Sequence, residues 1–177
     1  MKNNLKESGL KNGRKPSEGN ASFFQYALRR IGISDLVPHE GTLDWHLNEL
    51  KDLIAKDGHQ ARPIAVSSLE SMGLKWHGKF IIHDGHHRTK ALRTLGCSFV
   101  MCSVFDYADP RIKVFDYRTA SIPISKEAVI QRAILGTEIV PRFDKHFIEI
   151  DGKLSPFHNN SIIEPEVNTD LSQLMQP

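Results

Sequence analysis

The sequence is poor in cysteine and lacks long hydrophobic runs. Its 177 residues contain two cysteines, Cys97 and Cys102, and one possible pair is no disulfide framework. We therefore expect reduced, partly buried thiols, with a redox pair as the alternative. No apolar run is long enough to span a bilayer, and the N-terminus lacks the apolar core of a signal peptide. These features predict a cytoplasmic protein without a membrane partner.

The chain also has little net charge. It carries 23 Lys and Arg against 21 Asp and Glu, a formal charge of +2, which argues against nucleic acid as a partner. Hydrophobic residues make up 40% and charged residues 25%, as is ordinary for one globular domain. Both ends are polar, so we predict a flexible arm at 1–20, a folded domain at 21–155 and a flexible tail at 156–177. The oligomeric state is left open.

Hydrophobic periodicity predicts an alternation of strands and helices. Amphipathic patterns predict helices over residues 42–57, 89–95 and 126–135. Short apolar or alternating runs predict strands over residues 63–66, 80–83, 98–105 and 111–118. Residues 23–33 read as a strand or short helix, 140–150 as mixed, and Thr42 and Gly58 as the cap and stop of the first helix. The fold class expected is α/β, mixed α+β, with a small twisted mixed sheet flanked by helices.

The most informative segment is Asp84-Gly85-His86-His87-Arg88, which follows an apolar strand and precedes a helical pattern. The first N–H groups of a helix have no intrahelical partners and attract anions. Gly85 lets a ligand approach the backbone, while the imidazoles and the guanidinium can bind phosphate oxygens. Asp84 is expected to cap the helix or to hold a metal. The alternative is a turn with solvated side chains, but the density of these groups favours a phosphate site.

The histidines of this region also suggest a metal site. His83, His86 and His87 resemble ligands, and His77 is near in sequence. However, no second cluster has the spacing of a zinc site, and adjacent histidines point in different directions. Zinc is therefore the less favoured interpretation.

Two further groups of polar residues indicate a functional site only when they are considered together with this loop. Pro38-His39-Glu40 stands just before the first predicted helix, where a carboxylate often serves only as a dipole partner. Arg142, Lys145 and His146 form a basic group that, from spacing alone, reads as a solvated loop.

The order of these segments resembles the ParB/sulfiredoxin-like superfamily, and most closely its free L-serine kinases. The loop at 82–88 resembles the Val-Asp-Gly-His-His-Arg loop of these kinases, and 38–40 resembles the segment with their catalytic glutamate. Residues 126–146 resemble their C-terminal helix and basic substrate loop. In that loop Phe143 and Asp144 replace two threonines, and Tyr117 stands where a tryptophan is expected. These departures leave the identity of the acceptor open.

The resemblance implies a compact ParB/sulfiredoxin-like domain that transfers a phosphoryl group from ATP or ADP, with Mg²⁺, to the hydroxyl of free L-serine or a related amino acid. Its implied catalytic residues are Glu40 as general base, Asp84, which is also the implied Mg²⁺ ligand, and His87. Its implied nucleotide-binding and phosphate-binding residues are Gly85, His86, His87, Arg88 and Thr89. Its implied acceptor-binding residues are His39, Tyr117, Arg142, Lys145 and His146.

Other branches of the superfamily supply the alternatives. Sulfiredoxins carry a catalytic cysteine where this chain has His86, which argues against sulfinic acid repair. A ParB-like nucleotide-binding switch or a ParB-like nuclease would use the same loop on a nucleotide or on nucleic acid. The near-neutral charge and the short chain behind the loop, with no room for a DNA-binding domain, weigh against the switch. A nuclease is expected to show a basic groove.

Overall fold

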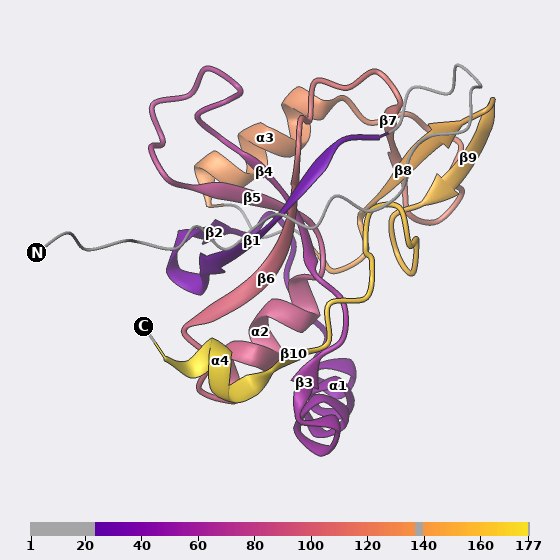
Figure 1. Ribbon diagram of the computed structural model, residues 1–177. Helices are drawn as coiled ribbons and strands as arrows, with labels where there is room; N and C mark the ends of the chain where they lie inside the picture. Colours follow the sequence, from indigo (N-terminus) through magenta and orange to yellow (C-terminus); the bar gives the residue numbers. More distant parts are fainter. Residues whose placement is uncertain (1–23, 137–139, 177) are drawn as a thin grey trace, which may run out of the picture.

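The computed structural model describes residues 24–136 and 140–176, so the predicted arm at 1–20 lies outside the described residues. Its centre is a five-stranded sheet with the order β1-β6-β4-β5-β2 (Figure 1). These strands are β1 (Tyr26–Gly32), β2 (Leu36–Val37), β4 (Ile64–Ser68), β5 (Phe80–Asp84) and β6 (Phe99–Phe105). β4 pairs parallel to β6, and β2 parallel to β5, while the other pairs are antiparallel. The predicted mixed sheet is thereby confirmed.

The central strands have apolar side chains on both faces and are covered on both sides. Helices α1 (Asp44–Asp57), α2 (His86–Thr94) and α4 (Leu171–Met175) pack on the face that carries Ile64 and Val66. Helix α3 (Lys126–Leu135) and a second sheet pack on the opposite face, against Ala65 and Ile81. That sheet consists of β7 (Ile112–Asp116), β8 (Asp144–Ile150) and β9 (Lys153–Pro156), all antiparallel. The remaining elements are the 3₁₀ turn Ile33–Asp35 and the pair β3 (His59–Gln60) and β10 (Thr169–Asp170).

Two helix starts differ from the prediction. Helix α1 begins at Asp44 without a side-chain cap, and the Thr42 hydroxyl accepts a hydrogen bond from Lys90 instead. Helix α2 begins at His86 rather than at residue 89, because Gly85 at φ 100° turns the chain directly from β5 into the helix. The phosphate loop predicted from the sequence is therefore the first turn of α2 itself.

The C-terminal segment was predicted to be flexible, and the structure corrects this. Phe157, Ile163 and Leu174 are fully buried, so the segment contributes to both cores of the domain. The mixed interpretation of 140–150 is also corrected, since β8 runs over Asp144–Ile150 and pairs with β7. In both cases the local polarity concealed a few apolar side chains that tertiary contacts bury.

Both cysteine thiols are free and buried, as predicted. Burial raises the pKa of Cys102, which suits an inert core residue. Across residues 24–136 and 140–176, none of the helices combines the length and the apolar character that crossing a membrane requires.

Candidate active site

A cavity of about 290 Å³ lies where the first turn of α2 meets the loops before α1 and β8. All the predicted site residues except His39 and Thr89 line it. The cavity thus brings together residues from three separate segments, which are 38–40, 84–88 and 142–146. The cavity also receives residues that were not predicted, which are His46, Leu50, His83, Asp144 and His158.

The N-terminus of α2 opens into this cavity. Gly85 is its N-cap residue, and no side chain caps the helix, so Asp84 does not take the capping role predicted for it. A Cβ atom at position 85 would lie 2.9 Å from Cδ1 of Ile64, so glycine is required by space as well as by its φ of 100°. An uncapped helix N-terminus with a glycine at its entrance is an arrangement that binds anions.

The two histidines of the first turn are held by backbone N–H donors. His86 Nε2 accepts from the N–H of His39 at 3.4 Å, and His87 Nε2 accepts from the N–H of Leu43 at 2.9 Å. Burial lowers the pKa of His86 well below its ordinary value, and burial together with the positive charges of His46 and Arg142 lowers that of His87 to about 4. Both rings are therefore neutral near pH 7, with the proton on Nδ1 available for donation.

Arg88 lies in a buried ion-pair network. Its guanidinium donates to the carbonyl of Pro63 at 2.7 Å, to Asp84 at 3.1 Å and to Glu164 at 2.6 Å. Burial pushes the pKa of Asp84 upward, but His158 and Arg88 outweigh it and hold that pKa below its usual range. Burial raises the pKa of Glu164 to about 7, against the opposing charge of Arg88. This network joins the first turn of α2 to the C-terminal segment.

Glu164 and His158 were missed because both stand in the supposed tail. The signal for Glu164 was the apolar pair Ile162-Ile163 directly before it, of which Ile163 is fully buried. His158 lines the cavity and lies 4.0 Å from the Asp84 carboxylate.

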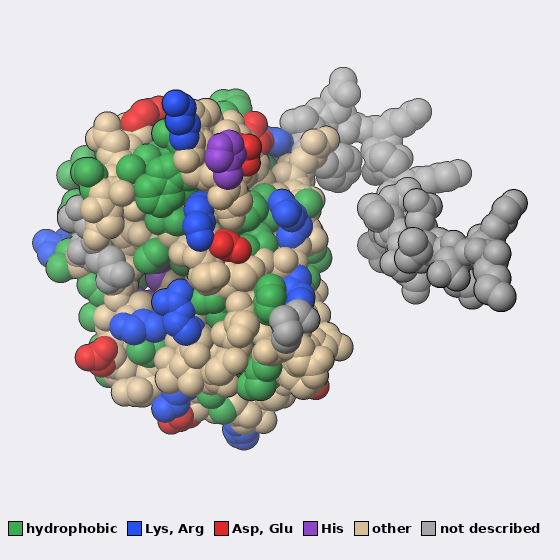
Figure 2. Space-filling view, turned by 90° about the vertical axis from the view of Figure 1, so that its left-hand side faces the viewer, with side chains coloured by type: hydrophobic (Ala, Val, Ile, Leu, Met, Phe, Trp, Pro, Cys, Tyr) green, Lys and Arg blue, Asp and Glu red, His purple; other side chains and the backbone are tan. Residues whose placement is uncertain are grey.

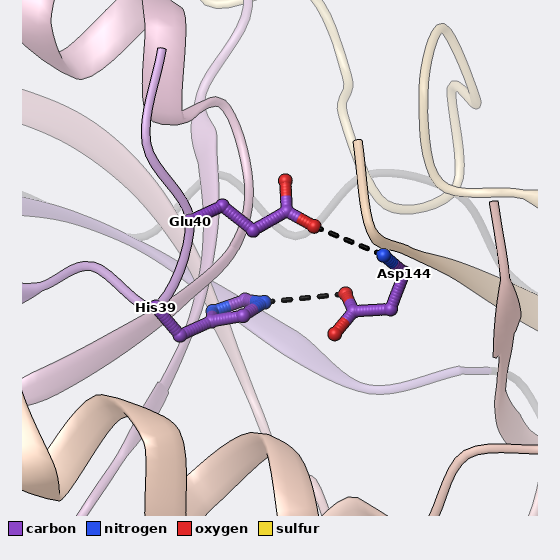
Figure 3. A group of neighbouring side chains, drawn as sticks. All are labelled: His39, Glu40 and Asp144. Atoms are coloured by element: carbon purple, nitrogen blue, oxygen red, sulfur yellow. Dashed lines mark hydrogen bonds and ion pairs between the residues drawn. The ribbon is translucent and has the colours of Figure 1, made fainter. Parts of the chain in front are cut away.

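Glu40 reaches the cavity from the loop before α1. Its Oε1 accepts from the N–H of Asp144 at 3.1 Å (Figure 3). Its Oε2 accepts from the N–H of Arg142 at 3.3 Å. Burial and the charge of Asp144 raise the pKa of Glu40 to about 7, although His39 and the two N–H donors oppose this. A carboxylate with that pKa can accept a proton near neutral pH.

Asp144 itself was not predicted as a site residue. Its carboxylate lies 3.2 Å from His39 Nε2 and 3.1 Å from a guanidinium nitrogen of Arg132. Burial raises the pKa of Asp144, but the hydrogen bond from His39 and the charges of His146, His39 and Arg132 lower it to about 2. Figure 3 shows the His39 ring pointing at this carboxylate. His39 is fully buried and does not line the cavity, so the prediction that it contacts the acceptor is replaced by a role in holding Asp144.

The basic loop forms one side of the cavity. The charged groups of Arg142 and Lys145 each lie 5.8 Å from the ring centroid of Tyr117. These three residues therefore form one cationic and aromatic wall. His146 is buried and lies 2.9 Å from the hydroxyl of Tyr107, with its pKa lowered to about 4 by burial. Its contribution to the wall is correspondingly small.

The zinc interpretation receives no support. His83 contacts the hydroxyl of Ser67 and stacks on Tyr107, and exposed His77 pairs with Glu70. Within the described ranges, the side chains close enough to share a metal ion form two groups, His39 with Glu40 and Asp144, and Asp84 with His158 and Glu164. Neither group contains the predicted histidines. In the first group both oxygens of Glu40 accept backbone hydrogen bonds and Asp144 pairs with Arg132, so we assign no metal there.

Comparisons with known proteins bear on this fold and site. No protein-family model matches the chain. In solved structures, the fold resembles a free serine kinase in complex with AMP, with a TM-score of 0.65 and 12% identity, covering 90% of this chain and 98% of that one. A variant of that kinase in complex with ADP has the same TM-score and identity, with 90% and 99% covered. C-terminally truncated SbnI from Staphylococcus aureus has a TM-score of 0.58 and 14% identity over 84% and 89% of the two chains.

Curated relatives point the same way. An ATP-dependent L-serine kinase of Staphylothermus marinus is 30% identical over 92 residues, which is 52% of this chain and 34% of the relative. One of Desulfurococcus mucosus is 33% identical over 84 residues, or 48% and 31%. The matched segments span about a third of the length of these relatives. The predicted relationship to free serine kinases is thereby confirmed in fold, and in sequence over about half of the chain.

Proposed function

We propose that this protein is a phosphotransferase that moves a phosphoryl group from ATP or ADP to the hydroxyl of free L-serine or a related amino acid. The observation that carries the proposal is that Glu40 and the uncapped N-terminus of α2 line one cavity. A base and an anion site within one cavity are the two parts that phosphoryl transfer to an alcohol requires. The related L-serine kinases and the shared fold support the kinase over the nucleotide switch and the nuclease.

The donor phosphates are proposed to bind at the first turn of α2. The N–H groups of this turn and the Nδ1 protons of His86 and His87 can donate to phosphate oxygens. The Thr89 hydroxyl donates a hydrogen bond to the carbonyl of Gly85 and so stabilises the turn. Arg88 contributes positive charge, but its three protein partners make positioning of Asp84 its main proposed role.

The donor set beside this turn also suits Mg²⁺. Asp84 lines the cavity and stays ionised, and carboxylate oxygen is the ligand type that Mg²⁺ prefers. Asp84 would hold the ion next to the phosphate site, with His158 close to the same carboxylate. When bound, Mg²⁺ supplies positive charge that stabilises the transferring phosphoryl group.

Glu40 is the proposed general base. The cationic and aromatic wall formed by Arg142, Lys145 and Tyr117 is the proposed acceptor site. The two N–H donors of the loop before β8 hold the Glu40 carboxylate in place to take the hydroxyl proton. Arg142 and Lys145 would bind the acceptor carboxylate, with Tyr117 packing beside them. His87, which lines the same cavity, would donate to the transferring phosphoryl group.

The surface and the thiols agree with this assignment. On the face shown in Figure 2, Lys and Arg side chains are separated by hydrophobic and acidic areas and do not form one basic groove. This face therefore lacks the continuous basic groove along which a nuclease would follow a phosphate backbone. We also propose a cytoplasmic location, since free, buried cysteines suit a reducing compartment.

The test is nucleotide turnover in the presence of single free amino acids. The protein is incubated with ATP or ADP and Mg²⁺, and phosphorylated amino acids are detected by mass spectrometry. We expect turnover that depends on L-serine or a close relative, and a loss of roughly two to four orders of magnitude in Glu40→Gln. Glu70→Gln, which changes an exposed carboxylate outside the cavity, is the matched control and should retain activity. Amino-acid-independent turnover, or equal activity in Glu40→Gln, would refute the kinase assignment.

A further inference from the structure

Asp144 acts on Glu40 through two separate groups. Its backbone N–H donates to Oε1 of Glu40 at 3.1 Å and fixes the position of that carboxylate. Its side chain brings a second carboxylate, and one oxygen from each residue and a ring nitrogen of His39 all lie within 4.8 Å of one another. The Asp144 side chain is only 1% exposed, so water screens the two charges poorly. In Figure 3 the two carboxylates lie on the same side of the Asp144 backbone nitrogen.

The two carboxylates have unequal partners. Asp144 is stabilised as an anion by the Arg132 guanidinium from α3 at 3.1 Å and by His39 at 3.2 Å. Glu40 accepts hydrogen bonds from two neutral backbone N–H groups. The proton therefore goes to Glu40, with a pKa of about 7, and not to Asp144, with a pKa of about 2.

We infer that Asp144 is a positioning residue whose fixed negative charge makes Glu40 a stronger base. The inference rests on the proposed kinase function for its role in the reaction, whereas the charge coupling is a property of the folded protein alone. In the resemblance described above, Asp144 stands where the free serine kinase pattern has a threonine, so the coupling departs from that pattern.

The other charged groups around Glu40 act differently. Arg142 and Lys145 share its cavity and favour its ionised form, as do Lys90 and Arg93 in the adjoining cavity. The imidazoles that share these cavities are His46 from α1, His83 from β5, His86 and His87 from α2, and His146 from β8. The buried His39 lowers the pKa of Glu40 through its charge. Elsewhere in the cavity, Asp84 pairs with both Arg88 and His158. Among the neighbouring charges, that of Asp144 raises the pKa of Glu40 most, so a neutral residue at position 144 tests its effect.

The direct test is a titration of the Glu40 carboxyl group by ¹³C NMR, assigned by its absence in Glu40→Gln. Asp144→Asn keeps the backbone N–H that holds Glu40 and removes the charge, together with one of the two oxygens that face His39 and Arg132. We expect the titration midpoint to fall by about 1 pH unit or more. Glu149→Gln, a half-exposed carboxylate further along β8, is the control and should leave the midpoint unchanged. If Asp144→Asn does not fold, Asp144→Thr supplies a second neutral side chain that can still accept from Arg132.

The kinetic test separates this role from a structural one. A lost charge coupling moves the acidic limb of the kcat/KM pH profile downward by the same amount as the NMR midpoint, whereas a loosened fold lowers activity at every pH. An unchanged NMR midpoint in both neutral variants overturns the inference, and so does an acidic limb that stays in place while the midpoint moves. An NMR shift in a protein without kinase activity supports the coupling and refutes the proposed function instead.

Discussion

The ion pair between Arg88 and Glu164 joins residues that are 76 positions apart in the sequence. Glu164 is fully buried, and its backbone carbonyl also accepts from Arg62 at 2.8 Å. Removal of one partner of a buried pair leaves the other charge without compensation, and this costs more than the pair itself contributes. Glu164 therefore matters for stability mainly because its loss would remove a partner from the buried Arg88 guanidinium.

We expect Glu164→Ala to lower the free energy of unfolding by about 1–3 kcal/mol, because it removes the shorter of the two carboxylate contacts of Arg88 and leaves that guanidinium paired with Asp84. Glu166→Ala, two residues further along and exposed, is the matched control and should stay within about 0.5 kcal/mol of the unchanged protein. Urea denaturation followed by circular dichroism measures both. Equal effects of the two substitutions would show that the network contributes nothing at this position.

Which site residues could be predicted depended on whether they were contiguous in sequence. Asp84 to Arg88 are contiguous in sequence, so an anion-binding function could be predicted for them before the fold was known. Asp144 and His158 acquire their meaning from neighbours more than 70 residues away, such as Asp84 for His158 and His39 for Asp144. No local pattern carries such information, because a tertiary contact supplies it.

At the scale of elements, the junction of β5 and α2 has the least room for change. Gly85 has a positive φ and lies against Ile64 of β4, so an added methyl group meets both backbone strain and a buried side chain. Gly58, the stop of α1, has a φ of 73° and has nothing within 4 Å of an added Cβ. The two glycines thus separate the cost of the conformation from the cost of the close approach.

We expect Gly58→Ala to cost about 1 kcal/mol of stability through its left-handed conformation alone. Gly85→Ala should cost at least about 1 kcal/mol more, because the methyl group overlaps the core as well. It should also weaken nucleotide binding, since the first turn of α2 must shift. Thermal unfolding and calorimetric titration with ADP measure the two effects. A Gly85→Ala protein that matches Gly58→Ala in both would contradict the close approach.

Elements with a strong apolar period were predicted well. Helix α3 was predicted at 126–135, the bounds that the structure gives, and β4, β5 and β6 were placed within two residues at each end. Apart from the starts of α1 and α2, the errors fall at β8 and at the C-terminal segment, where few apolar residues stand among polar ones. Burial there comes from β7 and from the helices, and a sequence window does not contain those partners.

At the scale of the whole molecule, buried titratable groups of opposite tendency determine the pH dependence of stability. Burial lowers the pKa of His83, His86 and His146, so the folded state binds fewer protons than the unfolded state below pH 6.5. Glu40 and Glu164 have raised pKa values of about 7 against an ordinary 4.5, so the folded state binds more protons between these values.

The histidine contribution to stability is gained as the pH rises toward 6.5, and the glutamate contribution is lost as the pH rises through 7. We therefore expect maximal stability of the metal-free protein near pH 6.5, measured as the free energy of unfolding in urea between pH 4 and 9 with EDTA. Glu40→Gln removes one of the two carboxyl groups whose ionisation lowers the free energy of unfolding at high pH. Relative to the unchanged protein it should be more stable at pH 8 than at pH 5, and an equal difference at both values would contradict the raised pKa.

The position of the C-terminal segment affects the order in which the protein can fold during synthesis. It runs from His158 at the cavity to α4 under the sheet, where the carbonyl of Leu174 accepts from the N–H of Ser98. A chain that emerges from the ribosome in order presents Arg88 long before its partner Glu164. Until then the Arg88 guanidinium has Asp84 and the Pro63 carbonyl as partners but lacks its shortest contact, so we expect the first turn of α2 to reach its final geometry only after the C-terminal segment docks.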